Sequence, residues 1–222
     1  MSLETSDRPQ LYVVRNEVDP DHEYHCDALA ARFPDAIEVD YPAGERVSLD
    51  DADGVVLTGS TAGVYEADRH PWIDEQKALV RELVDRQIPT LGVCFGHQIA
   101  NAALGGRVEH VGTDATLVQA ELDSDPLFSG IESVVVSLHG DHVTKAGAKM
   151  DVIASAEHCQ IYGTRHRSAP LWTVQFHPEI TASLRDRLIE DFEWHSSQYS
   201  FADVDAEGLF DNYRACVDRG DC

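Results

Sequence analysis

The stretch Gly92-Val93-Cys94-Phe95-Gly96-His97-Gln98 decides the fold class of this 222-residue chain. An apolar run, Thr90 to Val93, leads into it and is typical of a strand that is buried on both faces. An apolar segment from Ile99 to Leu104 follows, and Gly105 closes it as a glycine closes a helix. A sharp turn between strand and helix presents its central residue at the carboxyl end of the sheet, where ligands of open α/β folds bind. The stretch therefore predicts an α/β fold with Cys94 as a nucleophile.

Helices and strands alternate through the first half of the chain, which predicts a doubly wound, mostly parallel sheet. Helix spacing of apolar residues is clearest from Trp72 to Arg86, and a shorter helix is expected from Asp21 to Phe33. The expected strands are Leu11 to Arg15, Ala36 to Tyr41 and Val55 to Leu57.

The second half is richer in strands, which predicts antiparallel strands added to the parallel sheet. The expected strands are Arg107 to His110, Thr116 to Leu122, Val134 to Leu138, Val152 to Ala156, Gln160 to Thr164 and Leu171 to Phe176. Helices are expected at Thr181 to His195 and at Asp205 to Val217. No linker divides the chain, so we expect one domain over 1–222, with a core at about 11–195 and a C-terminal helical extension at 196–222.

Charge is the unusual feature of the composition, because 40 Asp and Glu stand against 17 Lys and Arg, a formal net charge of −23. Such a chain repels phosphates, so no nucleic-acid partner is expected. Dense carboxylates are typical of proteins that work in concentrated salt, although an ordinary acidic protein is the alternative. We expect no membrane span or secretory signal, since Met1 to Gln10 is polar. The five cysteines form no CxxC pair and favour a reducing, cytoplasmic compartment over a disulfide framework.

A base for the thiol is offered by Gln175-Phe176-His177-Pro178-Glu179, which follows a predicted strand. His177 and Glu179 are two residues apart, so both side chains can point to the same side at a strand end. Glu179 would then hold the imidazole in the orientation that a nucleophile's base requires. A lone histidine after a strand is usually structural, but this pairing favours catalysis by Cys94, His177 and Glu179.

These motifs resemble those of the class I glutamine amidotransferases, whose signatures are GxCxGxQ and HPE. Leu57-Thr58-Gly59-Ser60 with Gly63-Val64-Tyr65-Glu66 resembles the family's oxyanion loop, most nearly that of GMP synthase amidotransferase domains. Leu138-His139-Gly140-Asp141-His142-Val143 resembles their glutamine-site segment. The resemblance covers about 11–192 and implies a three-layer α/β/α sandwich with a flavodoxin-like sheet.

The resemblance also implies roles for individual residues. Cys94 would attack the side-chain amide of glutamine, and His177 would protonate the ammonia and then activate water. Backbone amides of Phe95 and of Gly59 or Ser60 would form the oxyanion hole. The residues expected to grip glutamine are Gln98, Leu138, His139, Gly140 and Asp141.

One departure from the family pattern concerns the oxyanion loop, where Ser60 and Thr61 replace the usual second glycine and proline. Plant γ-glutamyl peptidases are similar in this loop. A partner-independent γ-glutamyl hydrolase is therefore the alternative to a glutaminase that supplies ammonia to a separate synthetase. A non-catalytic binding or regulatory homologue is disfavoured, because the nucleophile, base and orienting acid are all present. The sequence leaves the ammonia acceptor and a homo-oligomer open.

Two histidine clusters suggest a metal but are interpreted otherwise. His22, His25 and Cys26 are spaced as on one helix face, which we expect to be exposed to solvent. His139, Asp141 and His142 are assigned to the glutamine site. We therefore expect no metal, and the lack of a Walker A or GxGxxG pattern predicts no cofactor.

Overall fold

The computed structural model describes residues 9–219. The polar N-terminus up to residue 8 and Cys222, on which some of the expectations above rest, lie outside the described residues. Among the described residues, no helix combines the length and apolar character that crossing a bilayer requires.

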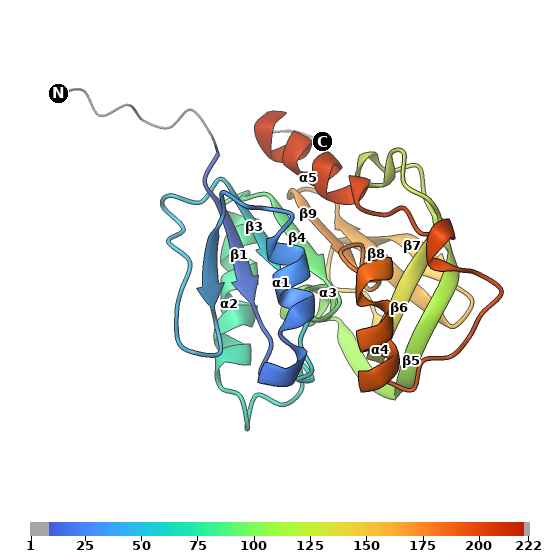
Figure 1. Cartoon of the computed structure of the whole chain (residues 1–222). Helices are drawn as coiled ribbons and strands as arrows, with labels where there is room; N and C mark the ends of the chain where they lie inside the picture. The colour runs from blue at the N-terminus through green and yellow to red at the C-terminus, as the bar shows by residue number, and fades with distance from the viewer. Residues whose placement is uncertain (1–8, 220–222) are drawn as a thin grey trace.

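A parallel sheet occupies the first half of the chain, as predicted (Figure 1). Its strands are short and almost fully buried, which explains their unbroken apolar sequences. In spatial order they are β2 (Ile37–Asp40), β1 (Leu11–Arg15), β3 (Gly54–Leu57), β4 (Thr90–Val93) and β9 (Leu171–Val174).

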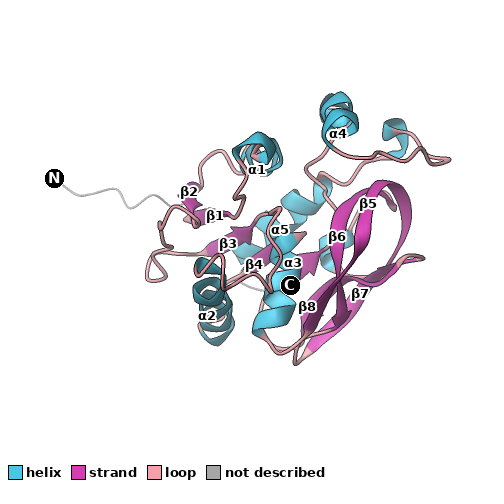
Figure 2. Ribbon diagram, turned by 90° about the horizontal axis from the view of Figure 1, so that it is seen from below, coloured by secondary structure: helices cyan, strands magenta, loops and turns pink. Residues whose placement is uncertain are grey.

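Helices cover both faces of this sheet, and Figure 2 shows α1 (Tyr24–Ala30) and α2 (Trp72–Asp85) on opposite sides of it. Alternation along β1 explains the two cores: Val13 packs with α1, whereas Val14 packs with α2. The helix after the elbow, α3 (Phe95–Ala103), lies on the α2 side. The predicted three-layer α/β/α sandwich is confirmed.

The C-terminal helix α5 (Gly208–Arg219) completes the α1 layer instead of lying loosely on the surface. Tyr213 is fully buried, and its hydroxyl lies 3.0 and 2.9 Å from the carbonyl oxygens of Val55 and Pro89, to which it donates. The helix begins three residues later than expected.

Four antiparallel strands extend the sheet beyond β9, as predicted. In spatial order they are β8 (Cys159–His166), β7 (Met150–Ala156), β5 (Arg107–Leu122) and β6 (Val134–Lys145). The sequence predicted two strands where β5 is one, because Gly112 sits in an irregularity between His110 and Asp114 at φ +105°. The predicted end of β6 at Leu138 is also wrong, since the strand continues through the His-Gly-Asp segment.

The long helix predicted from Thr181 to His195 is wrong. Only α4 (Arg185–Asp191) forms, after a 3-10 turn at Ala182–Leu184. Leu188 alone in α4 is buried, and it packs against β5 and β6. Further 3-10 turns are Pro20–His22, Pro126–Phe128 and Phe201–Asp203.

The cysteines follow the sequence expectation with one exception. Cys26, Cys94 and Cys159 are free and buried. Cys216 in α5 is disulfide-bonded, against the expectation of a chain whose thiols stay reduced.

Candidate active site

Cys94 occupies a strained turn between β4 and α3, with φ +52° and ψ −103°. Its amide donates to the carbonyl of Val174 at 2.9 Å, which ties the turn to β9. A Cβ on Gly92 would lie 2.5 Å from the Gly96 oxygen, and a Cβ on Gly96 would lie 2.4 Å from the Leu57 oxygen. Only glycine fits at either position, so the sequence encodes the elbow through these two residues.

His177 and Glu179 form the buried pair that the sequence predicted, with 2.6 Å between Nδ1 and Oε1. The other ring nitrogen, Nε2, lies 3.1 Å from the carbonyl oxygen of Leu138. Both nitrogens therefore face acceptors, which only an imidazolium satisfies as a double donor. Burial opposes this charge, but Glu179 and Cys94 outweigh it and hold the pKa of His177 well above its usual value.

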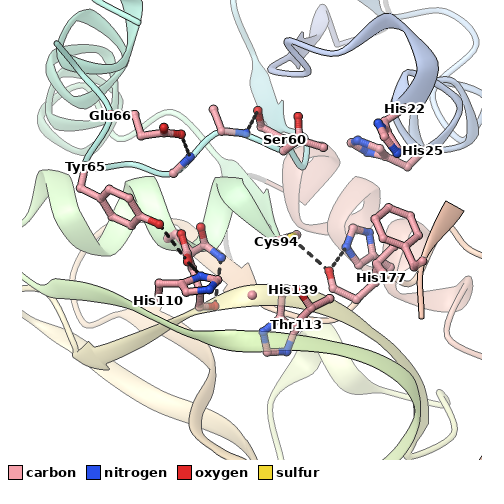
Figure 3. Close-up of a pocket in the computed structure, with 18 residues that line it drawn as sticks. His22, His25, Ser60, Tyr65, Glu66, Cys94, His110, Thr113, His139 and His177 are labelled. Carbon is pink, nitrogen blue, oxygen red and sulfur yellow. Dashed lines mark hydrogen bonds and ion pairs between the residues drawn. The ribbon is translucent and has the colours of Figure 1, made fainter. Parts of the chain in front are cut away.

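The carbonyl of Leu138 also accepts from the thiol of Cys94, whose Sγ is 3.8 Å away. One backbone oxygen thus gathers the thiol and the imidazole at the same point of β6 (Figure 3).

A cavity of about 340 Å³ opens above Cys94. The structure brings most of the predicted site residues to its wall, whereas Glu179 is buried behind His177. The predicted lining residues are Ser60, Cys94, Gln98, Leu138, His139, Gly140, Asp141 and His177. Unpredicted lining residues include His22, His25, Tyr65, His110 and Phe192.

The segment after β3 lies beside the elbow, since the amide of Gly96 donates to the carbonyl of Thr58 at 3.1 Å. A Cβ on Gly59 would come within 3.4 Å of both His25 and His177, so the loop packs directly on the base. The amides of Ser60 and Phe95 donate to no other group within residues 9–219. They are available to an oxyanion.

The far wall of the cavity is organised around Asp141. Its carboxylate receives the Tyr65 hydroxyl at 3.1 Å and lies 2.9 Å from His110 Nδ1. Its carbonyl accepts from Gln98 Nε2 at 3.2 Å. Segments distant in sequence thus converge here through polar groups. By contrast, His97 of the elbow motif points away and is held by Thr173 at 2.8 Å, a structural role.

A family model for "Glutamine amidotransferase class-I" matches residues 28–195, about three quarters of the chain. The chain belongs to this family.

Relatives of this amidotransferase include proteins of two lengths. It is 25% identical over 187 residues to a protein of Methanothermobacter thermautotrophicus that is named as one subunit of glutamine-hydrolyzing GMP synthase, which covers 82% of the chain and 95% of that protein. It is 32% identical over 177 residues to "GMP synthase [glutamine-hydrolyzing]" of Mycobacterium bovis, which covers 75% of the chain. It spans only 32% of the latter's length, and 26% of the Yarrowia lipolytica GMP synthase.

Solved structures share the amidotransferase fold. A glutamine amidotransferase of Methylobacillus flagellatus superposes with a TM-score of 0.74 at 18% identity, covering 97% of this chain and 96% of that one. One from Thermotoga maritima gives 0.71 at 21% identity, covering 96% and 93%.

The amidotransferase has a second buried acid–histidine pair that the sequence did not reveal. His25 Nε2 lies 2.8 Å from Glu17 Oε2, and the His25 ring is centred 6.1 Å from that of His177. His25 and Cys26 are thus buried, and the expected exposed helix face is wrong. Burial opposes both charges, but the mutual hydrogen bond, with Cys26 beside His25 and Thr61 beside Glu17, raises the pKa of His25 and lowers that of Glu17.

Glu17 also holds the oxyanion loop. Its carboxylate accepts from the amide of Thr61 at 3.0 Å and from the Thr61 hydroxyl. Thr61 is one of the residues that depart from the family's glycine and proline. That departure was the available sequence signal for a local anchor, but nothing in the sequence indicated that Glu17 supplies it.

Proposed function

We propose that this amidotransferase hydrolyses the side-chain amide of glutamine through a glutamyl thioester on Cys94. The observation that carries the proposal is the convergence of the strained Cys94 elbow and the buried His177–Glu179 pair on the carbonyl of Leu138. A nucleophile, a base and an orienting acid are the groups that acyl transfer requires.

The first half of the reaction forms the thioester. Cys94 Sγ attacks the amide carbon, and the carbonyl oxygen becomes an oxyanion that the amides of Phe95 and Ser60 stabilise. The amide of Gly59 is the other candidate in this loop. His177 gives its proton to the departing nitrogen, which leaves as ammonia while the C–N bond breaks.

The second half releases glutamate. Neutral His177 takes a proton from water, the hydroxide attacks the thioester carbon, and the C–S bond breaks to restore the thiolate of Cys94. Glu179 stabilises the imidazolium that forms in each half and fixes Nδ1 as a donor.

Glutamine is proposed to extend from Cys94 toward Asp141. Its amino-acid end carries both a cation and an anion, and the wall offers acceptors and donors for each. The acceptors are the Asp141 carboxylate and the Gly140 carbonyl, while Gln98 and His110 offer N–H groups. Backbone groups of Leu138 and His139 complete this wall.

Ammonia is proposed to pass to a separate synthetase protein. The Methanothermobacter relative supports this division, since it is named as one subunit of a GMP synthase and the chain covers 95% of it. A GMP synthase acceptor is the candidate that these relatives suggest.

We also propose that the protein works in a salt-rich cytoplasm. A net charge of −23 creates self-repulsion that concentrated counterions screen.

The test uses the purified chain in molar KCl, supplied with glutamine or with γ-glutamyl dipeptides, and measures glutamate release. The Cys94→Ser chain is the matched control. We expect slow glutamate release from glutamine that requires Cys94 and that a cognate synthetase stimulates.

Absence of glutamate from glutamine, with and without the synthetase, would contradict the proposal. Rapid turnover of dipeptides that no synthetase stimulates would instead assign the chain to the γ-glutamyl hydrolases.

A further inference from the structure

Three imidazoles gather beside the proposed glutamine pocket. His139 and His142 belong to β6, and His158 lies in the turn between β7 and β8. Each offers a ring nitrogen, and these nitrogens all lie within 4.8 Å of one another. The ring centroids of His139 are 4.9 Å from His142 and 5.6 Å from His158. The proposed glutamine chemistry uses none of these rings.

A carboxylate completes the cluster. Asp114 Oδ2 lies 3.1 Å from His158 Nε2 and accepts from the Ser137 hydroxyl at 2.6 Å. Ser137 Oγ is also 3.1 Å from His139 Nε2. The sequence had grouped Asp141 with His139 and His142, but the Asp141 side chain faces His110 and Tyr65 instead.

The environment favours neutral rings with lone pairs available. Burial, together with the neighbouring imidazoles, holds the pKa values of His139 and His142 below the usual histidine value. His139 is 6% exposed, and its Nδ1 is buried without a hydrogen-bond partner in the described part of the chain. Neutral imidazole is the form of histidine that binds metals.

We propose that His139, His142, His158 and Asp114 bind a divalent transition metal ion of the zinc class. Three imidazoles and one carboxylate form a donor set suited to Zn²⁺. Ligand atoms around tetrahedral zinc lie about 3.3 Å apart, given Zn–N bonds of about 2.0 Å. The cluster therefore closes slightly on binding, which the turn position of His158 and the irregular strand beside Asp114 permit.

Access and support are both present. Asp114 and His158 line a surface hollow together with Gln119 and Tyr199, so an ion can enter from solvent. Ser137 orients the carboxylate, as outer groups do at metal sites. The bound ion would join β6 to the β7–β8 turn through His139, the residue that follows Leu138. Metal binding at this cluster does not depend on glutamine hydrolysis.

The test is a Co²⁺ titration of the full chain carrying Cys94→Ser, followed by visible absorption and calorimetry. This substitution removes the pocket thiol as a competing ligand. We expect one ion per chain, with d–d absorption and no thiolate–cobalt band. His158→Ala and Asp114→Ala should each weaken binding at least about tenfold. Both side chains are partly exposed, so these variants should fold.

Controls are His195→Ala, an exposed histidine outside the cluster, and His22→Ala, in the other histidine group. Neither should change the affinity for Co²⁺. Failure to bind stoichiometric metal at micromolar concentration would overturn the proposal. Unchanged affinity in His158→Ala, or loss that follows His22→Ala, would overturn it as well.

Discussion

At the residue scale, the Leu138 carbonyl holds the thiol and the imidazole together and keeps His177 as a double donor. Glu179 provides the opposing charge from the other side of the ring. The reactive geometry therefore depends on one backbone atom and one buried carboxylate as much as on Cys94 itself.

We predict that Glu179→Gln lowers kcat by about 10²-fold or more, since general acid–base catalysis contributes about that much. The pKa of His177 is raised, so the imidazolium is retained until the pH rises through that value. Without the carboxylate this pKa falls, and the alkaline limb of the kcat/KM profile should move to lower pH. The profile is measured beside Glu193→Gln, an exposed control. An alkaline limb that stays in place would refute the assigned role.

Glu17→Gln tests the second pair. Breaking a buried ion pair typically costs about 3 kcal/mol of unfolding free energy, and kcat should fall more than KM rises because Thr61 is released. Glu17's lowered pKa adds stability above pH 4.5 that is lost as pH falls to about 2. His25's raised pKa adds stability below pH 6.5 that is lost as pH rises through its folded pKa.

The stability gap between wild type and Glu17→Gln should thus be largest between these two values, measured by urea unfolding across pH. Thr61→Val removes one hydrogen bond to Glu17 but keeps the pair, and should lose activity with less loss of stability. A gap that does not vary with pH would count against the ion pair.

The sequence predicted Cys94, His177 and Glu179 because each lies in a local motif whose spacing fixes its geometry. It missed Glu17 and His25 because their roles arise from contacts across the fold. Glu17 reaches Thr61 over 44 residues, and no periodicity or motif encodes that separation.

At the scale of elements, the elbow depends on how closely α3 approaches β3 and β4. We predict that Gly96→Ala lowers the unfolding free energy by about 2 kcal/mol, as overpacking does. Turnover of glutamine should fall at least tenfold, because shifting the helix moves Cys94.

Denaturant unfolding and glutamate release measure both effects. Gly208→Ala is the control, since its Cβ would meet its nearest neighbour at an ordinary 3.4 Å. Equal behaviour of the two variants would mean that the close approach at Gly96 is not required.

The elements themselves were predictable where burial sets the pattern. The buried parallel strands appear as apolar runs, and all were located. The end of β6 and the continuity of β5 were missed, because polar residues facing the cavity interrupt the alternation. The failed C-terminal helix had apolar residues at helical spacing, but the tertiary structure buries only Leu188 within α4. The division into a core and an extension at 196–222 stays a prediction.

At the scale of the whole molecule, charge dominates. Salt shortens the screening length from about 10 Å at 0.1 M to about 3 Å at 1 M, so carboxylates repel one another less. We predict that the midpoint of urea unfolding rises steadily between about 0.1 M and 1 M KCl. Sucrose, which does not screen charge, separates this from a general solvent effect. A midpoint that stays flat in KCl would contradict the salt-rich setting.

The central claim is that glutamine is opened by a covalent bond to Cys94. Intact-mass analysis of the chain, acid-quenched during turnover of glutamine, tests it most directly. We expect a fraction of chains heavier by one glutamyl group, mapped to the peptide that contains Cys94 and absent from Cys94→Ala. Glutamate production with no adduct in wild type, and undiminished in Cys94→Ala, would contradict it.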